Sequence, residues 1–285
     1  MRNLPLAILT VAISACAGEI GPESVWKDGP KLLPDIVKAC DSASEFPACF
    51  ARQLTEKAPP AALAFARSMK YEAWMRDFRA AGRVSVAKVV HQFRANENNG
   101  WLFVNGSPAL FDPDDFKRLE SATHGDPEWA RLTARYPKAM LFPGDRSGAV
   151  GPLAILHSDG AQEFIADYFV MDGCHACAVL GNAYFSFEFN AKGKFTAARF
   201  LGFETEPVWL VRTRTGQRFT LRLGCEGACS WTEAQPPASH IIRLAAGKDD
   251  GIDCDVVGSG ATQASLRSGS GAVVIRFSAA PGLRR

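Results

Sequence analysis

The feature that most constrains the fold is an alternation of apolar and other residues that begins at Val84 and Val86. It is clearest at 183–189, where Ala183, Phe185, Phe187 and Phe189 are separated by Tyr184, Ser186 and Glu188. Successive side chains of a strand point to opposite faces, so this period is typical of β-strands. Turn sequences such as Asp159-Gly160 separate the runs, so the sequence predicts strands that pair antiparallel with their neighbours in the chain.

Helical patterns precede these strands. Residues 34–58 predict one or two short helices, and the apolar spacing from Pro60 to Phe78, with Gly82 as a cap, predicts a longer one. Asp112 and Asp126 each stand before a proline, as helix N-caps do. Residues 34–203 are therefore expected to form an α+β domain, with helices followed by an antiparallel sheet.

From residue 205 to 283 the apolar runs become short and are separated by Gly-rich turns, which predicts six or seven strands. We expect this segment to form a second, all-β, immunoglobulin-like sandwich domain. Hydrophobic content of 47% and charged content of 22% are those of a globular protein. The net charge of +2, with scattered basic residues, gives no reason to expect nucleic acid as a partner.

The first residues have the features of an export signal. The apolar run Leu4–Ile13 follows Arg2 and is too short for a membrane helix, which needs roughly 20 residues. The sequence Ile13-Ser14-Ala15-Cys16 resembles the bacterial lipobox, which implies lipidation of Cys16, a signal peptide at 1–16 and a tether at 17–33. There are two alternatives. One is cleavage after Ala15-Cys16-Ala17 without lipidation, and the other is a buried N-terminal helix. We expect an exported protein of the periplasm or cell envelope, held to the membrane by its lipid.

Export places the cysteines in an oxidising compartment, where disulfides form. Cys40 and Cys49 are expected to pair and to staple a helical hairpin, although spacing alone does not fix the pairing. The number of cysteines left after Cys16 is odd, so at least one thiol is free or is paired between chains. These seven are Cys40, Cys49, Cys174, Cys177, Cys225, Cys229 and Cys254.

The segment Cys174-His175-Ala176-Cys177 has several interpretations. Redox cysteines of the thioredoxin type stand at a helix N-terminus, whereas Ala178 to Asn182 lead into a strand pattern. Covalent haem attachment needs a histidine where Ala178 stands, and a zinc site needs two further ligands. A small disulfide loop that braces a turn is the favoured interpretation, and a redox role stays open.

Other catalytic signals are missing from the sequence. It has no nucleophile elbow, zinc-protease helix, phosphate loop or dinucleotide fingerprint. We therefore expect no catalytic residues, no metal and no cofactor, and we do not expect an enzyme.

The C-terminal segment resembles the chagasin-type inhibitors of papain-like cysteine proteases. The resemblance covers residues 205–282 and depends on four motifs in order. These are Gly216-Gln217-Arg218-Phe219, the segment from Gly224 to Trp231, Val257-Gly258-Ser259-Gly260-Ala261-Thr262, and Gly271-Ala272-Val273-Val274-Ile275-Arg276-Phe277.

The resemblance implies that three loops at one end of the sandwich form a wedge for a protease cleft. The family's Asn-Pro-Thr-Thr-Gly-Tyr has become Gly224 to Cys229 here, and its Arg-Pro-Trp is replaced by Ser278 to Pro281. Cys254 is expected near this end, where it could pair with Cys225 or Cys229. For Trp231, core packing is the alternative to partner contact. The partner-binding residues implied are Cys225, Glu226, Gly227, Ala228, Cys229, Trp231, Gly258, Ser259, Gly260, Ala261, Ala279 and Ala280.

The leading hypothesis from the sequence is thus an envelope lipoprotein whose C-terminal sandwich binds a protein partner, with a papain-like cysteine protease as the candidate. The alternatives are a thiol–disulfide module that uses Cys174 and Cys177, or a purely structural lipoprotein.

Overall fold

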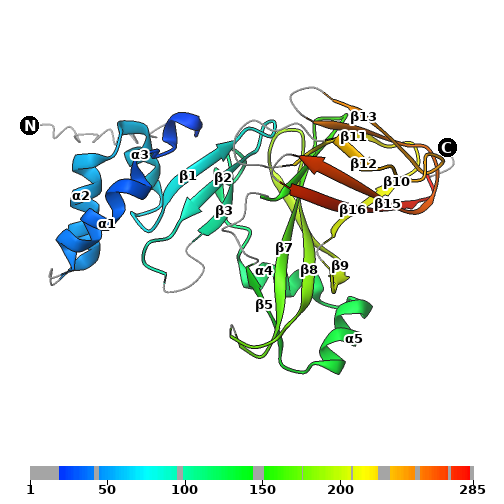
Figure 1. The fold of residues 1–285 in the computed structure, drawn as a ribbon, viewed down its shortest axis with the longest axis horizontal. Helices are drawn as coiled ribbons and strands as arrows, with labels where there is room; N and C mark the ends of the chain where they lie inside the picture. Colours follow the sequence, from blue (N-terminus) through cyan, green and yellow to red (C-terminus); the bar gives the residue numbers. More distant parts are fainter. Residues whose placement is uncertain are drawn as a thin grey trace, which may run out of the picture.

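The structure is a computed structural model, and it describes residues 19–41, 45–94, 99–143, 151–174, 176–206, 208–223, 232–247, 251–268 and 271–282. Most of these residues lie in antiparallel β-sheets, with a few helices. The N-terminal helices lie at one end of an elongated molecule and the C-terminal strands lie at the other (Figure 1). The predicted signal peptide, with Cys16, lies outside the described residues. No helix in the described ranges has the length and hydropathy to cross a membrane.

The helical end is formed by a short 3-10 helix, η1 (Pro22–Ser24), and by α1 (Gly29–Cys40), α2 (Phe46–Lys57) and α3 (Pro60–Ser68). Trp26, only 1% exposed, packs in their core, and its backbone N–H donates to Met75 O. The tether predicted at 17–33 was therefore wrong from residue 19 on, because this segment supplies core side chains and the first turns of α1.

A first sheet of four antiparallel strands follows: β1 (Trp74–Arg79), β2 (Ser85–Val90), β3 (Asn99–Val104) and β4 (Leu110–Phe111). The helix predicted through Phe78 was wrong, because α3 ends at Ser68. Lys70 and Tyr71 have left-handed φ angles of 53° and 61°, which turn the chain away from the helix axis. Trp74 then pairs with Val90, and its segment becomes a strand of this sheet.

The largest sheet has eight strands in the order β13-β14-β11-β6-β7-β8-β9, with β5 paired to β7. Their bounds are β5 (Ala139–Pro143), β6 (Leu153–His157), β7 (Gln162–Asp172), β8 (Val179–Phe189), β9 (Phe195–Glu204), β11 (Arg218–Arg222), β13 (Ile242–Ala246) and β14 (Ile252–Val256). The residues at 183–189 form part of strand β8, as their alternation predicts, and Phe185, Phe187 and Phe189 all pack in one hydrophobic core. The antiparallel strands predicted from this alternation are confirmed.

Helices α4 (Phe116–Thr123) and α5 (Pro127–Arg135) contribute Leu119 and Leu132 to that core. Asp126 caps α5 as predicted, accepting from the backbone N–H groups of Glu128 and Trp129. The cap of α4 is Asp115, whereas Asp112 accepts from the Asp114 N–H in the preceding turn. The helix start predicted at Asp112 was thus wrong by one turn.

The third sheet has the order β10-β16-β15-β12, with β10 (Trp209–Arg214), β12 (Thr232–Gln235), β15 (Gly260–Ser268) and β16 (Gly271–Ala280). It packs on the β13-β14-β11 part of the large sheet through an apolar core that includes Val211, Leu221 and Ile275. In an immunoglobulin-type sandwich, strand E lies between B and D, and F lies between C and G. The strands β14 and β15 occupy these two positions, so the pairing order is of the immunoglobulin type.

The strand that pairs with β11 on its other side is β6, from the preceding segment of the chain. Leu156 pairs with Thr220, and Ala154 pairs with Arg222. One sheet therefore runs through the boundary predicted near residue 204, and the layout of two separate domains is not confirmed.

Candidate functional site

The second predicted loop and the end of β16 lie together at one end of the sandwich. Gly260 pairs with Ala279, and Ala261 pairs with Ser278, in the antiparallel β15–β16 ladder. Ser259, Gly260, Ala261 and Ala280 are exposed, whereas Ala279 is buried. Four of the predicted binding residues thus form one exposed, small-residue surface.

The backbone of this end is held by several hydrogen bonds. The N–H groups of Val257 and Gly258 both donate to Ile241 O, at 2.9 and 3.2 Å. A Cβ at Gly258 would lie 2.2 Å from His240 O, so only glycine allows this approach. The surface around Ser259 is therefore fixed before any partner binds.

The residue that follows the first predicted loop lies at the other end of β15. Cys225, Glu226, Gly227, Ala228, Cys229 and Trp231 lie outside the described residues, but the strands that flank them are described. Thr232, at the start of β12, pairs with Arg267, at the opposite end of the nine-residue strand β15 from Gly260. At about 3.3 Å per residue, the seven steps from Gly260 to Arg267 span roughly 23 Å. The position of Thr232 argues against the expectation that all three loops meet at one end, although the first loop itself lies outside the described residues.

Cys254 is a buried free thiol in the middle of β14. It pairs with Phe219 on one side and with Leu244 on the other. Burial, and then the charge of Asp253, raise the pKa of the thiol far above its ordinary value, so it stays neutral. Of the options for Cys254, the free thiol is the one observed.

Cys174 and Cys177 form a disulfide at the tip of the β7–β8 hairpin. The Cys177 N–H donates to Cys174 O at 3.0 Å, and β8 begins two residues later, so no helix follows the pair. Cys174 is exposed, and Cys177 is partly buried. The disulfide predicted for this turn is present, without the helix dipole that redox enzymes of the thioredoxin type use.

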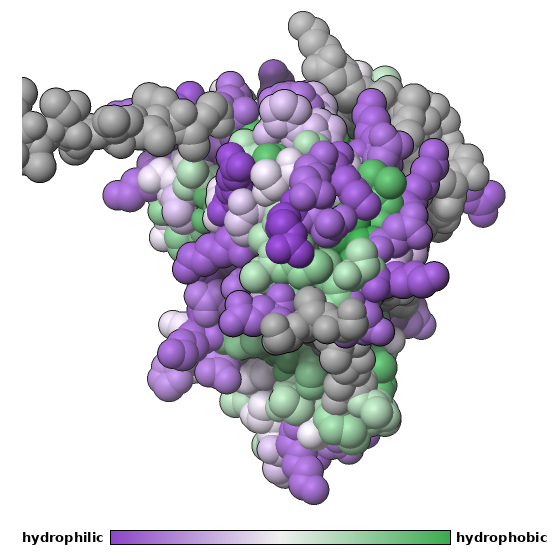
Figure 2. Space-filling view, turned by 90° about the vertical axis from the view of Figure 1, so that its left-hand side faces the viewer, coloured by the Kyte–Doolittle hydropathy of each residue, from purple (hydrophilic) through white to green (hydrophobic). Residues whose placement is uncertain are grey.

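Exposed apolar side chains accompany this tip. Met140 is 41% exposed and Val179 is 53% exposed, and both pair with Met171 of the central strand β7. Figure 2, which faces the left-hand side of Figure 1, shows hydrophobic atoms among hydrophilic ones on the lower part of the molecule. The disulfide thus lies near two exposed apolar side chains.

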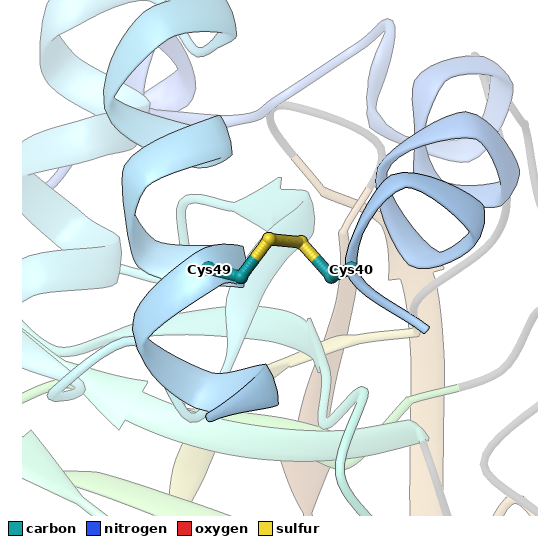
Figure 3. Close-up of a disulfide and its surroundings, with 2 residues drawn as sticks. All are labelled: Cys40 and Cys49. Atoms are coloured by element: carbon teal, nitrogen blue, oxygen red, sulfur yellow. A yellow bond between two sulfur atoms is a disulfide. The ribbon is translucent and has the colours of Figure 1, made fainter. Parts of the chain in front are cut away.

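The second predicted disulfide, Cys40–Cys49, joins α1 to α2 (Figure 3). Cys40 is fully buried and Cys49 is 6% exposed. The pairing expected from the sequence is therefore present, and it staples two helices as predicted.

A cleft of about 750 Å³ lies between the β7–β8–β9 face and the β10–β16 pair. Ligand sites commonly have volumes of about 300–1,000 Å³. No local sequence pattern indicates this cleft, because it joins strands from both sides of residue 204. Its lining is His157, Ala161, Gln162, Glu163, Ser186, Glu188, Phe189, Asn190, Thr196, Arg199, Phe200, Leu201, Arg212, Thr213, Arg214, Gln217, Ser278, Ala279 and Ala280.

The acidic groups of the cleft already have basic partners. Arg199 forms an ion pair with Glu188, and His157 Nε2 lies 3.7 Å from a carboxylate oxygen of Glu163. Arg212 donates across the cleft to the backbone oxygen of Leu201. Arg212 and Arg214 form a basic wall of the cleft. The sequence signal that could have indicated this wall is Arg212-Thr213-Arg214, in which two arginines alternate along a strand.

No metal cluster is present among the residues that the structure describes, taking three His, Cys, Asp or Glu side chains as the minimum. No family model matches this chain, and no curated protein matches it either.

Two solved structures are similar at low scores. Domains 1–6 of the surface layer protein SbsC share 10% identity at a TM-score of 0.21, over 74% of this chain and 28% of that one. The I9–I11 tandem of titin shares 8% identity at a TM-score of 0.19, over 72% of this chain and 95% of that one. Neither value supports an argument about fold or function.

Proposed function

We propose that the chain is an exported, lipid-anchored protein of the cell envelope that binds a protein partner through the Ser259 end of its C-terminal sandwich. The observation that carries the proposal is the exposed surface of Ser259, Gly260, Ala261 and Ala280, which backbone hydrogen bonds at Val257 and Gly258 hold in place. A surface that is ordered before association loses little conformational entropy on binding. The two disulfides agree with an oxidising compartment.

The test of binding is a substitution that keeps the fold and changes the surface. Ser259→Trp adds a large side chain at an exposed position, whereas Gln263→Trp makes the same addition on an exposed residue farther along β15. With a photo-crosslinker at Ala280 in envelopes, we expect one discrete adduct that Ser259→Trp removes and Gln263→Trp keeps. An adduct pattern that neither variant changes would contradict binding at this end.

The narrower form of this function is inhibition of a papain-like protease. The separation of the first loop from Gly258 to Ala261 argues against a wedge of three loops, so we expect the full chain to leave papain active at micromolar concentration. Inhibition that Ser259→Trp abolishes would establish this narrower function through the second loop alone. Inhibition that Ser259→Trp leaves intact would instead place the contact outside the proposed end.

A second candidate function is thiol–disulfide exchange, and the exposure of Cys174 favours it. A thiolate of a protein dithiol would attack one sulfur of the Cys174–Cys177 bond, which forms a mixed disulfide and releases the other cysteine as a thiolate. The partner's second thiolate would then attack the mixed disulfide, which closes the partner's own disulfide and releases the remaining cysteine. The partner loses two electrons and the hairpin gains them. In glutathione buffers, we expect an exchanging pair to have a reduction potential above about −300 mV. A bond that stays oxidised throughout that range would exclude this candidate.

A further inference from the structure

We infer that the cleft between β9 and β10 binds a small, hydroxyl-bearing acid, such as a uronic acid or a sugar phosphate. This ligand is separate from the protein partner proposed for the Ser259 end, and the inference does not depend on export or on partner binding.

Ser186 supplies a buried hydroxyl to this cleft. It lies on β8, is only 1% exposed, and lines the cleft. Its hydroxyl oxygen has no hydrogen-bond partner in the described part of the protein. A buried polar group without a partner is destabilising, so a ligand group that bonds to Ser186 would offset this cost.

The charges of the cleft point to an acid. Arg199 offsets the charge of Glu188, whereas His157, beside Glu163, carries a charge only when it is protonated. Arg212 and Arg214 line the same space, and within the described residues neither forms an ion pair with a carboxylate. The cleft therefore has three arginines against two glutamates, an excess of one positive charge, and a guanidinium binds carboxylate or phosphate oxygens through paired N–H groups.

The remaining polar groups fit hydroxyls. Thr196, Ser278 and Asn190 also line the cleft, and the carboxylates of Glu163 and Glu188 can accept hydrogen bonds from ligand hydroxyls. Donors and acceptors are thus mixed beside a basic wall, which suits a ligand that has several hydroxyls and one anionic group.

The edge of β9 argues against an extended peptide as the occupant. Leu201 O accepts from Arg212, and the Phe203 N–H donates to a carboxylate oxygen of Glu128. These side chains occupy backbone groups that an added strand would need. The occupant is therefore recognised by side chains, and a small acid fits this requirement.

The test is calorimetric titration of the full chain with glucuronic acid, glucose 6-phosphate, glucose, and an acidic hexapeptide of Glu residues. We expect at least one of the two acids to bind and glucose to bind at least tenfold more weakly. Arg214→Gln should weaken the acid roughly tenfold, the equivalent of one charge-assisted hydrogen bond. Arg243→Gln, an exposed arginine on the edge strand β13, is the matched control and should leave affinity unchanged.

Ser186→Ala gives a second, independent measurement. Because the hydroxyl has no partner in the described residues, its removal should leave thermal stability equal or higher while it weakens the acid several-fold. The inference is overturned if neither acid binds at 10 mM, if glucose binds as well as the acids, or if Arg214→Gln and Arg243→Gln behave alike. Binding of the Glu peptide in preference to both acids would also overturn it and would assign the cleft to a protein partner.

Discussion

The two disulfides of this protein are similar bonds in different surroundings. Cys40–Cys49 is buried and joins two helices that pack against each other, α1 and α2. Cys174–Cys177 closes the exposed tip of one hairpin, whose strands β7 and β8 already pair over ten residue pairs. A cross-link contributes most where the chain between its ends is otherwise free to separate, so the two bonds should differ in what their loss costs.

The largest effect is expected at the helical end. In the chain-entropy account, a loop of about ten residues contributes about 3 kcal/mol, and the loss of two buried sulfur side chains adds about 1 kcal/mol. We therefore expect Cys40→Ala/Cys49→Ala to lower the free energy of unfolding by about 4 kcal/mol, as measured by urea titration of fluorescence. The matched control is Cys174→Ala/Cys177→Ala, and equal losses in the two double variants would break the comparison.

Acid should weaken the same end of the molecule by a different route. His91 follows β2 and is buried, and burial, followed by the charge of Arg94, lowers its pKa from 6.5 to about 4; Asp114 and a backbone hydrogen bond at Glu72 oppose this shift. The unfolded chain then binds a proton that the folded chain excludes, so stability is full above pH 6.5 and falls as the pH goes from 6.5 to 4. At about 1.4 kcal/mol per unit, the loss is on the order of 3 kcal/mol.

The variant that isolates this effect is His91→Gln, which cannot gain a proton. Urea titrations at pH 7, 5.5 and 4 should give a shallower loss for His91→Gln than for the unchanged chain. His240→Gln is the control, because His240 is exposed and its variant should follow the unchanged chain. Parallel curves for all three proteins would show that burial at His91 does not set the acid response.

The same two regions show what the sequence could predict. The β7–β8 hairpin was predictable, because the alternation at 183–189 fits a β-strand and not a helix. The turn at Asp159-Gly160 joins β6 to β7 as expected. The helical end was harder, because Trp74 and Phe78 also fit helical spacing. The left-handed backbone of Lys70 and Tyr71 ends the helix and places Trp74 and Phe78 in a strand. Lysine and tyrosine seldom adopt a left-handed conformation, so the sequence does not predict this turn.

The candidate site was predictable only in part, for a reason of topology. Local patterns identified Gly258 to Ala261 and the strand to Ala280, which the structure brings together. They did not show that β6 pairs with β11, since that pairing joins residues more than sixty positions apart. The cleft with Ser186 and Arg214 results from this arrangement, and a local motif does not encode it.

The smallest effect is expected at the hairpin tip. A loop of about four residues contributes at most about 2 kcal/mol in the chain-entropy account, and the strand pairing of Met171 with Val179 restrains the same loop. We therefore expect Cys174→Ala/Cys177→Ala to lower the free energy of unfolding by about 1 kcal/mol. Because Cys174 is exposed, a dithiol reagent should open this bond before it opens Cys40–Cys49, which timed alkylation and peptide mass measurement would follow. Reduction of the buried pair first would contradict the assignment of accessibility, and it would imply that the helical end opens more often than the hairpin tip.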